Sequence, residues 1–249
     1  MKQKTILITG GSRGIGAATA VLAAARGYQV GINYLENEIA AERTVAFIKR
    51  NGGRAEAFAA DVSSEKEVVA LFESIDSRMG YLHALVNNVG ILEPQMRVEA
   101  MGGERLQRIF YHNVISCFMC SREAIRRMST KRGGAGGAIV NVSSIAARTG
   151  APGEYVDYAA SKGAVDTFTL GLAKEVADEG VRVNGVRPAF IYTDIHASGG
   201  EPDRVDRIRE SIPMKRGGKP EEVAQAILWL LSGEASYSTG TFIDITGGR

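Results

Sequence analysis

Seven short apolar runs recur along the chain, and a helical pattern or a polar loop separates each from the next. The runs occupy residues 6–8, 30–33, 55–59, 84–86, 138–142, 181–186 and 242–245. Their length and their β-branched content predict buried strands. Strands that alternate with helices form a parallel sheet with right-handed crossovers. We therefore expect an α/β Rossmann fold, a doubly wound parallel sheet of about seven strands with helices on both faces.

The chain of 249 residues with 45% hydrophobic content can bury one full core, and no linker divides it, so residues 1–249 are predicted to form a single domain. Basic and acidic residues, 30 against 28, are interspersed, which argues against nucleic acid and favours a small ligand. The first apolar run is too short for a signal peptide, and no segment approaches membrane-spanning length. The sequence predicts a cytoplasmic protein without a membrane partner.

The first apolar run leads into a turn with Gly10, Gly14 and Gly16, and an alanine-rich helical pattern follows. Glycine lets the backbone turn sharply and approach a pyrophosphate closely. The following helix directs unpaired N–H groups and its positive dipole end at the phosphate charge. The spacing differs from the common G-x-G-x-x-G fingerprint, but the physical requirement is the same. The turn predicts a phosphate-binding site.

The same turn contains Ser12 in a G-x-S-x-G sequence, which is also typical of the nucleophile elbow of serine hydrolases. Such an enzyme needs a later histidine, and His196 is the best placed of the three in the chain. Only eleven residues precede Ser12, so the earlier strands and the oxyanion loop of a hydrolase have no sequence to form them. We consider a hydrolase the weaker hypothesis.

Polar or turn-forming residues follow four later strands. They are Asp61-Val62, Asn87-Asn88-Val89-Gly90, Ser143-Ser144 and Pro188-Ala189. Each alone could be a helix cap or a turn. The carboxyl ends of parallel strands share one edge of the sheet, where ligands bind in doubly wound folds. These residues therefore predict one ligand site at that edge.

Tyr158 and Lys162 are four residues apart at the start of a helical stretch that runs to about residue 179, so they share a helix face. An ammonium group beside a phenol favours the phenolate, which predicts a lowered tyrosine pKa and acid/base use. Tyr155 has Ala159 at the same spacing and is expected only to line the pocket. Ser144 ends the preceding strand and could hydrogen-bond a carbonyl oxygen.

Cys117 and Cys120 form a lone C-x-x-C sequence in an apolar, helical segment at 114–120. A zinc site would need a second cysteine pair, and a redox motif would need an exposed, electropositive setting. Free cysteine is among the most buried residue types. We expect both thiols in the core and no metal site.

Taken together, these motifs resemble the short-chain dehydrogenase/reductase family over essentially the whole chain. The resemblance is to the branch that includes sugar dehydrogenases and 3-oxoacyl-[acyl-carrier-protein] reductases. It implies a catalytic set of Asn113, Ser144, Tyr158 and Lys162. It also implies cofactor contacts at Gly10, Ser12, Arg13, Gly14, Ile15, Gly16, Asn33, Tyr34, Asp61, Val62, Asn88, Val89, Gly90, Tyr158, Lys162, Pro188, Ala189, Ile191 and Thr193.

The family resemblance also implies the role of each residue in interconverting an alcohol and a carbonyl. Tyr158 exchanges a proton with the substrate oxygen, and Ser144, favoured over Ser143 on this resemblance, orients that oxygen. Lys162 lowers the tyrosine pKa and holds the nicotinamide ribose, while Asn113 anchors a water that connects Lys162 with solvent. At two positions, Val89 and Ala189 replace the family's usual alanine and glycine, so we expect altered packing near the nicotinamide.

The residues after the second strand indicate which nicotinamide cofactor binds. NAD-specific folds place an acid there, but this chain has Asn33 and Tyr34, and Glu36 is expected at the solvated start of the next helix. Arg13 offers a cation that suits the 2′-phosphate of NADP(H). The sequence favours NADP(H) over NAD(H).

Substrate choice is expected to depend on residues 91–103, 148–154 and 194–215. The last of these is polar and glycine-bearing, which is typical of a mobile lid and favours a small polar substrate. A nucleotide-binding regulatory protein without turnover is the alternative function. The resemblance implies a homotetramer, with a homodimer as the alternative.

Overall fold

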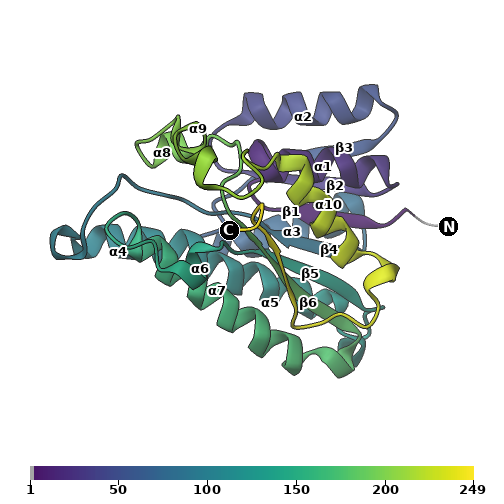
Figure 1. The fold of residues 1–249 in the computed structure, drawn as a ribbon. Coiled ribbons are helices and arrows are strands. Elements are labelled where there is room, and N and C mark those ends of the chain that lie inside the picture. The colour runs from purple at the N-terminus through teal and green to yellow at the C-terminus, as the bar shows by residue number, and fades with distance from the viewer. Residues whose placement is uncertain (1–2) are drawn as a thin grey trace.

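The computed structural model describes residues 3–249 and contains one seven-stranded parallel sheet in the order β3-β2-β1-β4-β5-β6-β7 (Figure 1). The strands are β1 Thr5–Ile8, β2 Gln29–Tyr34, β3 Arg54–Ala59, β4 Leu82–Asn87, β5 Gly137–Val142, β6 Val181–Pro188 and β7 Phe242–Ile245. All seven predicted strands are confirmed, and the predicted bounds differ by at most two residues at either end.

Long helices cover both faces of the sheet (Figure 1). The first face carries α1 Gly14–Ala25, α2 Glu38–Arg50 and α10 Pro220–Leu231, and the second carries α3 Glu65–Met79, α5 Ser116–Met128 and α7 Val156–Glu175. Successive side chains of a strand point to opposite faces, so Ile6 and Ile8 of β1 join the first core while Leu7 joins the second. This buried alternation confirms the doubly wound architecture.

Shorter elements complete the chain. They are the 3₁₀ turns Val98–Ala100, Thr130–Arg132, Ala177–Glu179, Arg209–Ser211 and Gly233–Ala235, the π-helix Tyr111–Ile115, and the helices α4 Gly103–Phe110, α6 Ala146–Thr149, α8 Ile195–Ser198 and α9 Arg204–Ile208. No helix within residues 3–249 has the length and apolar content needed to cross a membrane.

The direction of strand order reverses at β1, which pairs with β2 on one side and β4 on the other. A doubly wound sheet opens a crevice at this point, beyond the carboxyl ends of its strands. The turn after β1, the turn after β4 and the segments after β5 and β6 all begin at this edge. The topology therefore gathers the motifs that the sequence distributes over most of the chain.

Candidate active site

The turn after β1 has the backbone shape that a phosphate cradle requires. Gly10 and Gly14 have φ angles of +60° and +54°, a region that side chains disfavour. A Cβ added at Gly16 would collide with the carbonyl oxygen of Gly10 and lie 2.7 Å from Asn88 Nδ2. These glycines let α1 begin directly against the turn, so its unpaired first N–H groups face the crevice.

Asn88 joins this turn to the end of β4. Its Nδ2 donates to the carbonyl oxygens of Thr9 and Gly10, both at 3.0 Å, and its backbone N–H donates to Thr9 Oγ1 at 3.0 Å. Thr9 Oγ1 also donates to the Val86 carbonyl at 3.3 Å. Asn88 thus fixes the shape of the predicted cofactor loop, and Thr9, at the start of that loop, supports it.

The other end of the cavity is formed after β2 and β3, where Asn33, Tyr34, Asp61 and Val62 line it. Asn33 is buried, and its Nδ2 donates to the Ala60 carbonyl at 2.9 Å. Asp61 Oδ1 accepts from the backbone N–H and the hydroxyl of Ser63 at 2.8 and 2.7 Å. Asn33 therefore supports the strand ends, while Asp61 and Tyr34 remain at the cavity surface.

Arg13 and Glu36 both lie at this end of the cavity with exposed side chains. Neither forms a side-chain hydrogen bond or ion pair with any residue from 3 to 249. The expectation that Glu36 begins the next helix is wrong, because α2 begins at Glu38 and Asn37 caps it by accepting from Ala40 N at 3.0 Å. A free cation and a free carboxylate thus lie near the same part of the crevice.

Ser143 and Ser144 follow β5 and point to different sides. Ser143 is buried and its Oγ donates to the Lys162 carbonyl at 3.2 Å. Ser144 is partly exposed, lines the cavity, and its Oγ accepts from Ala146 N at 3.1 Å. Both serines line the cavity, but the Ser143 hydroxyl is buried and already bonded to Lys162, so Ser144 is the better placed to reach a ligand.

Tyr158 and Lys162 lie on the cavity side of α7, and Lys162 Nζ is 5.6 Å from the centre of the tyrosine ring. Burial raises the pKa of Tyr158, and the hydrogen bond with Ser144 acts in the opposite direction. This differs from the expectation that Lys162 lowers that pKa. The reason is that Lys162 is itself buried and donates to the Val142 carbonyl at 2.8 Å, and burial lowers its own pKa to about 8.

Asn113 lies in the π-helix Tyr111–Ile115, an irregularity that often accompanies functional sites. Its Oδ1 accepts from Ile91 N at 2.7 Å, and its Nδ2 donates to Ser161 Oγ at 3.0 Å. A Cβ added at Gly90 would lie 3.2 Å from Lys162 Nζ and 3.7 Å from Asn113 Oδ1. The turn after β4 therefore passes close to both side chains.

The end of β6 and the segment that follows it form another wall of the crevice. Pro188, Ala189, Ile191 and Thr193 line the cavity. A Cβ at Gly14 would lie 3.2 Å from Thr193 Cγ2, so this segment touches the turn after β1.

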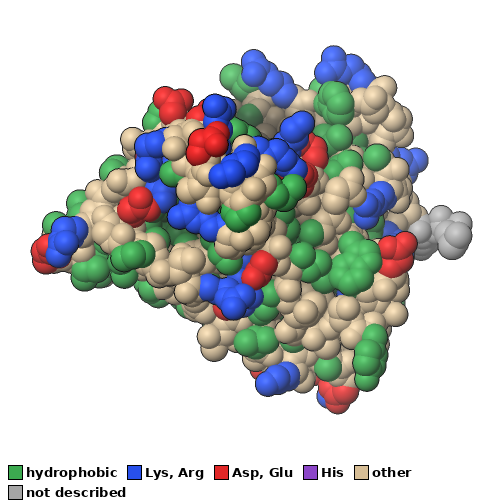
Figure 2. Space-filling model, viewed as in Figure 1, with side chains coloured by type: hydrophobic (Ala, Val, Ile, Leu, Met, Phe, Trp, Pro, Cys, Tyr) green, Lys and Arg blue, Asp and Glu red, His purple; other side chains and the backbone are tan. Residues whose placement is uncertain are grey.

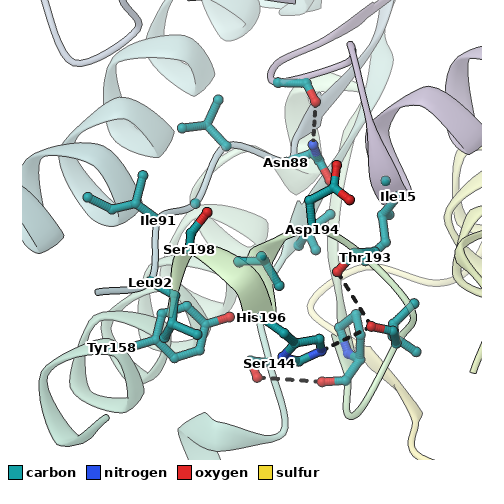
Figure 3. A pocket seen from close by; sticks show the side chains of 18 of the residues that line it. Ile15, Asn88, Ile91, Leu92, Ser144, Tyr158, Thr193, Asp194, His196 and Ser198 are labelled. Atoms are coloured by element: carbon teal, nitrogen blue, oxygen red, sulfur yellow. Dashed lines mark hydrogen bonds between the residues drawn. The ribbon is translucent and has the colours of Figure 1, made fainter. Parts of the chain in front are cut away.

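These residues surround one cavity of about 970 Å³, large enough for a dinucleotide and a small substrate. Figure 3 shows two groups on its walls. Ile15, Asn88, Thr193 and Asp194 lie towards the glycine turn, and Leu92, Ser144, Tyr158 and His196 lie together at the other side. The glycine turn leaves room where side chains would fill it, so the residues present fit a bound nicotinamide dinucleotide.

The segment at 194–215 packs over this cavity. Tyr155 donates its hydroxyl proton to the Gly199 carbonyl at 3.1 Å, and it lines the cavity as expected. Arg204 is buried, forms ion pairs with Glu154 and Glu201, and lies 4.7 Å over the Tyr155 ring. Figure 2 shows basic and acidic side chains intermixed over α8 and α9 on this face.

The hydrolase hypothesis does not fit this arrangement. His196 Nε2 bonds to the Ile191 carbonyl at 3.0 Å, and its Nδ1 has no partner among residues 3–249, so no serine–histidine–acid chain forms there. Cys117 and Cys120 are buried free thiols, as predicted, and burial raises the pKa of Cys117 to about 12. The described part of the chain holds no cluster of three or more side chains suited to a metal ion.

Comparisons with known proteins agree with the fold. The family model described as enoyl-(acyl carrier protein) reductase matches residues 10–249. An Escherichia coli protein named uncharacterized oxidoreductase YgfF is 60% identical over 98% of both chains. Glucose 1-dehydrogenase 2 of Bacillus subtilis is 36% identical over 98% of this chain and 94% of its own. The crystal structure of a Brucella melitensis 3-ketoacyl-(acyl-carrier-protein) reductase complexed with NADH has a TM-score of 0.91 at 34% identity, covering 99% of this chain and 98% of that one.

The chain belongs to the short-chain dehydrogenase/reductase family. It is therefore an oxidoreductase that depends on a nicotinamide cofactor. Within this short-chain dehydrogenase/reductase, the cavity at the carboxyl edge of the sheet is the candidate active site.

Proposed function

We propose that the protein interconverts an alcohol and a carbonyl group on a small polar substrate with NADP(H), and that Tyr158 carries the proton. The observation that supports this most is the single cavity that holds Ser144, Tyr158 and Lys162 at one side and the glycine turn at the other. A hydride donor and a proton donor must both reach one carbonyl group, and this cavity has room for the cofactor as well as for a substrate beside Tyr158.

The nicotinamide cofactor supplies the hydride when it is bound. Gly10, Gly14 and the N-terminal end of α1 would hold its pyrophosphate. Asp61 and Val62 would hold the adenine end, and Asn88, Val89 and Gly90 would line the middle of the cavity. Lys162 and the segment from Pro188 to Thr193 would hold the nicotinamide end. The departures at Val89 and Ala189 keep apolar side chains there, so we expect changed packing with retained binding.

Tyr158 is suited to donate a proton. Because burial raises its pKa, the phenol is protonated at neutral pH and can give its proton to the carbonyl oxygen of a substrate. In the opposite direction, the phenolate would accept the proton of an alcohol. Ser144 Oγ, which lowers that pKa through its hydrogen bond, would orient and polarise the same oxygen.

Lys162 and Asn113 would support the proton transfer. The lowered pKa of Lys162, about 8, lets the amine exchange a proton near neutral pH. Asn113 holds the Ile91 backbone and Ser161 together, which keeps Lys162 beside the turn after β4. A water anchored at Asn113 that reloads Lys162 remains part of the proposal.

The preference for NADP(H) rests on Arg13. Its guanidinium is exposed at the end of the cavity that follows β2, without a partner in the described chain. A guanidinium matches phosphate geometry with paired donors. Glu36 at the same end opposes an added phosphate, so the two side chains compete in setting the preference.

A homotetramer, or a homodimer as the smaller alternative, is supported by apolar side chains exposed on the helices that carry Asn113 and Lys162. They are Phe110, Tyr111, Ile115, Phe118 and Leu170, between 36% and 53% exposed. Apolar groups clustered on one face mark an interaction surface. The cytoplasmic location stays a prediction from the sequence.

The replacement Tyr158→Phe tests the proposed function. Loss of the general acid is expected to lower turnover about 100- to 10,000-fold. Cofactor affinity, measured by nucleotide fluorescence, is expected to change little. Tyr81→Phe is the matched control, because the Tyr81 hydroxyl donates to the Gly136 carbonyl at 2.9 Å, at the amino edge of the sheet. Cofactor binding without turnover by the wild type, across sugars, polyols, diketones and 3-oxoacyl thioesters, would instead favour the regulatory alternative.

A further inference from the structure

His196 holds a hydrogen-bond acceptor, Nδ1, that no residue from 3 to 249 uses. It lies in α8, 9% exposed, and its ring lines the cavity. Its Nε2 is 3.0 Å from the Ile191 carbonyl oxygen, which can only accept. The proton of the ring therefore sits on Nε2, and Nδ1 presents a lone pair.

The surroundings keep this ring neutral. Burial lowers the pKa of His196 and the charge of Arg204 acts in the same direction, while the Ile191 carbonyl and Glu201 act oppositely. The net direction is downward, so the neutral form predominates at neutral pH. Nδ1 is then an acceptor and cannot donate.

Nδ1 is buried without a hydrogen-bond partner within residues 3–249. Buried polar atoms of native proteins are nearly always paired, so an unpaired one needs an explanation. Other contacts already hold the segment at 194–215 in place: Tyr155 bonds the Gly199 carbonyl, and a Cβ at Gly199 would lie 2.7 Å from Leu92 Cδ2. Holding this segment therefore does not account for the unpaired Nδ1. The anchoring that His196 adds comes from the bond between Nε2 and the Ile191 carbonyl, and it does not need Nδ1.

His196 lies in the wall of the cavity that holds Ser144 and Tyr158, and all three are labelled in Figure 3. Ser198, from the same helix, also lines this cavity, and its hydroxyl bonds to no residue in the described chain. Ile91 and Leu92, which line the same cavity, are apolar and offer Nδ1 no side-chain donor.

We propose that His196 Nδ1 accepts a hydrogen bond from a hydroxyl group that the substrate carries close to its reacting carbon. The substrate class is then a polyol or a hydroxy-carbonyl compound. A 3-oxoacyl thioester has no O–H or N–H group beside its keto carbon and would leave Nδ1 unpaired. This inference rests on the proposed function, because it assigns the substrate of the same cavity.

Two variants separate the role of His196 Nδ1 as an acceptor from the role of Nε2 as an anchor to Ile191. In His196→Gln the amide nitrogen can replace Nε2 on the Ile191 carbonyl, but no acceptor remains at the Nδ1 position. In His196→Asn the amide oxygen can replace Nδ1, but the bond to Ile191 is lost. The assay is reduction of two ketone pairs that differ by one hydroxyl, acetoin with butanone and 2-hydroxycyclohexanone with cyclohexanone.

We expect the wild type to prefer the hydroxyketone of each pair by about tenfold or more in kcat/KM. The preference should fall towards unity in His196→Gln and persist in His196→Asn. A preference retained in His196→Gln, or a preference lost in His196→Asn, would overturn the proposal and leave His196 as a structural anchor.

The remaining outcomes distinguish this inference from the proposed function. Turnover of 3-oxoacyl thioesters but of neither hydroxyketone, still lost in Tyr158→Phe, overturns the substrate class and supports the function. Turnover of no compound at all, with cofactor bound, overturns both.

Discussion

Arg105 of α4 and Asp157 of α7 form a buried ion pair, with Arg105 Nε 2.7 Å from Asp157 Oδ2. The side chains are 7% and 1% exposed. Asp157 Oδ1 also accepts from the Tyr158 backbone N–H at 2.9 Å, and Arg105 donates to the Pro94 carbonyl at 2.8 Å. The pair therefore ties the loop after β4 to the first turn of the helix that carries Tyr158.

Removing one partner of this pair should destabilise the fold strongly. Arg105→Met leaves the Asp157 carboxylate buried and uncompensated, which is expected to lower the free energy of unfolding by about 3–5 kcal/mol. Urea unfolding measures it. Lys131→Met is the control, because Lys131 and Asp178 form an exposed pair and its loss should change the free energy of unfolding little. Equal stability losses in the two variants would contradict the assignment.

The sheet could be predicted because each strand is a short apolar run that neighbouring residues alone reveal. Each site motif follows the end of one such run. The shared cavity followed from topology, since parallel strands present their carboxyl ends at one edge. Tertiary contacts were beyond that reasoning. Arg105 and Asp157 are 52 residues apart, and no pattern of spacing connects them.

Protonation could not be predicted from spacing either. The four-residue interval placed Tyr158 and Lys162 on one helix face correctly, but the direction of the tyrosine pKa depends on burial and on where the lysine donates. The unpaired nitrogen of His196 is similarly visible only in three dimensions, because it follows from the position of the Ile191 carbonyl.

Arg13 and Glu36 should shift cofactor preference in opposite directions. Arg13→Ala is expected to weaken NADPH binding about tenfold or more, by analogy with the loss of a charge-assisted hydrogen bond, and to change NADH binding little. Glu36→Gln should strengthen NADPH binding because it removes a competing negative charge. Titration of nucleotide fluorescence gives both affinities.

Arg43→Ala is the control for charge, since Arg43 is exposed on α2 and does not line the cavity. Unchanged relative affinities for NADPH and NADH in Arg13→Ala would refute the NADP(H) preference.

The exposed apolar side chains of α5 should control assembly. Phe118 is 47% exposed and stacks on Phe168 with ring centres 3.9 Å apart. A charge at an apolar interface is desolvated without a partner, so Phe118→Glu is expected to shift the assembly to a smaller species in sedimentation analysis. Phe47→Glu is the matched control, because Phe47 on α2 is also 47% exposed. A wild type that sediments as a monomer would refute the oligomer.

Lys162 should lower the stability of the fold at neutral pH. Its pKa in the folded chain is about 8, below the ordinary value of 10.5, because burial disfavours its charged form. Between these pH values the unfolded chain binds more protons than the folded one, so the stability of the wild type rises with pH in that window. Below pH 8 the full penalty of the buried charge is present.

Lys162→Met removes this penalty and is expected to increase the free energy of unfolding at pH 7 by about 1–3 kcal/mol, while turnover is lost. The advantage should shrink as the pH rises from 8 towards 10.5, where the wild-type amine is neutral in both states. Urea unfolding at pH 7 and pH 9.5 measures the difference, with Lys174→Met, exposed on the same helix, as the control. A variant less stable than the wild type at pH 7 would show that the bond to the Val142 carbonyl outweighs the desolvation of the ammonium.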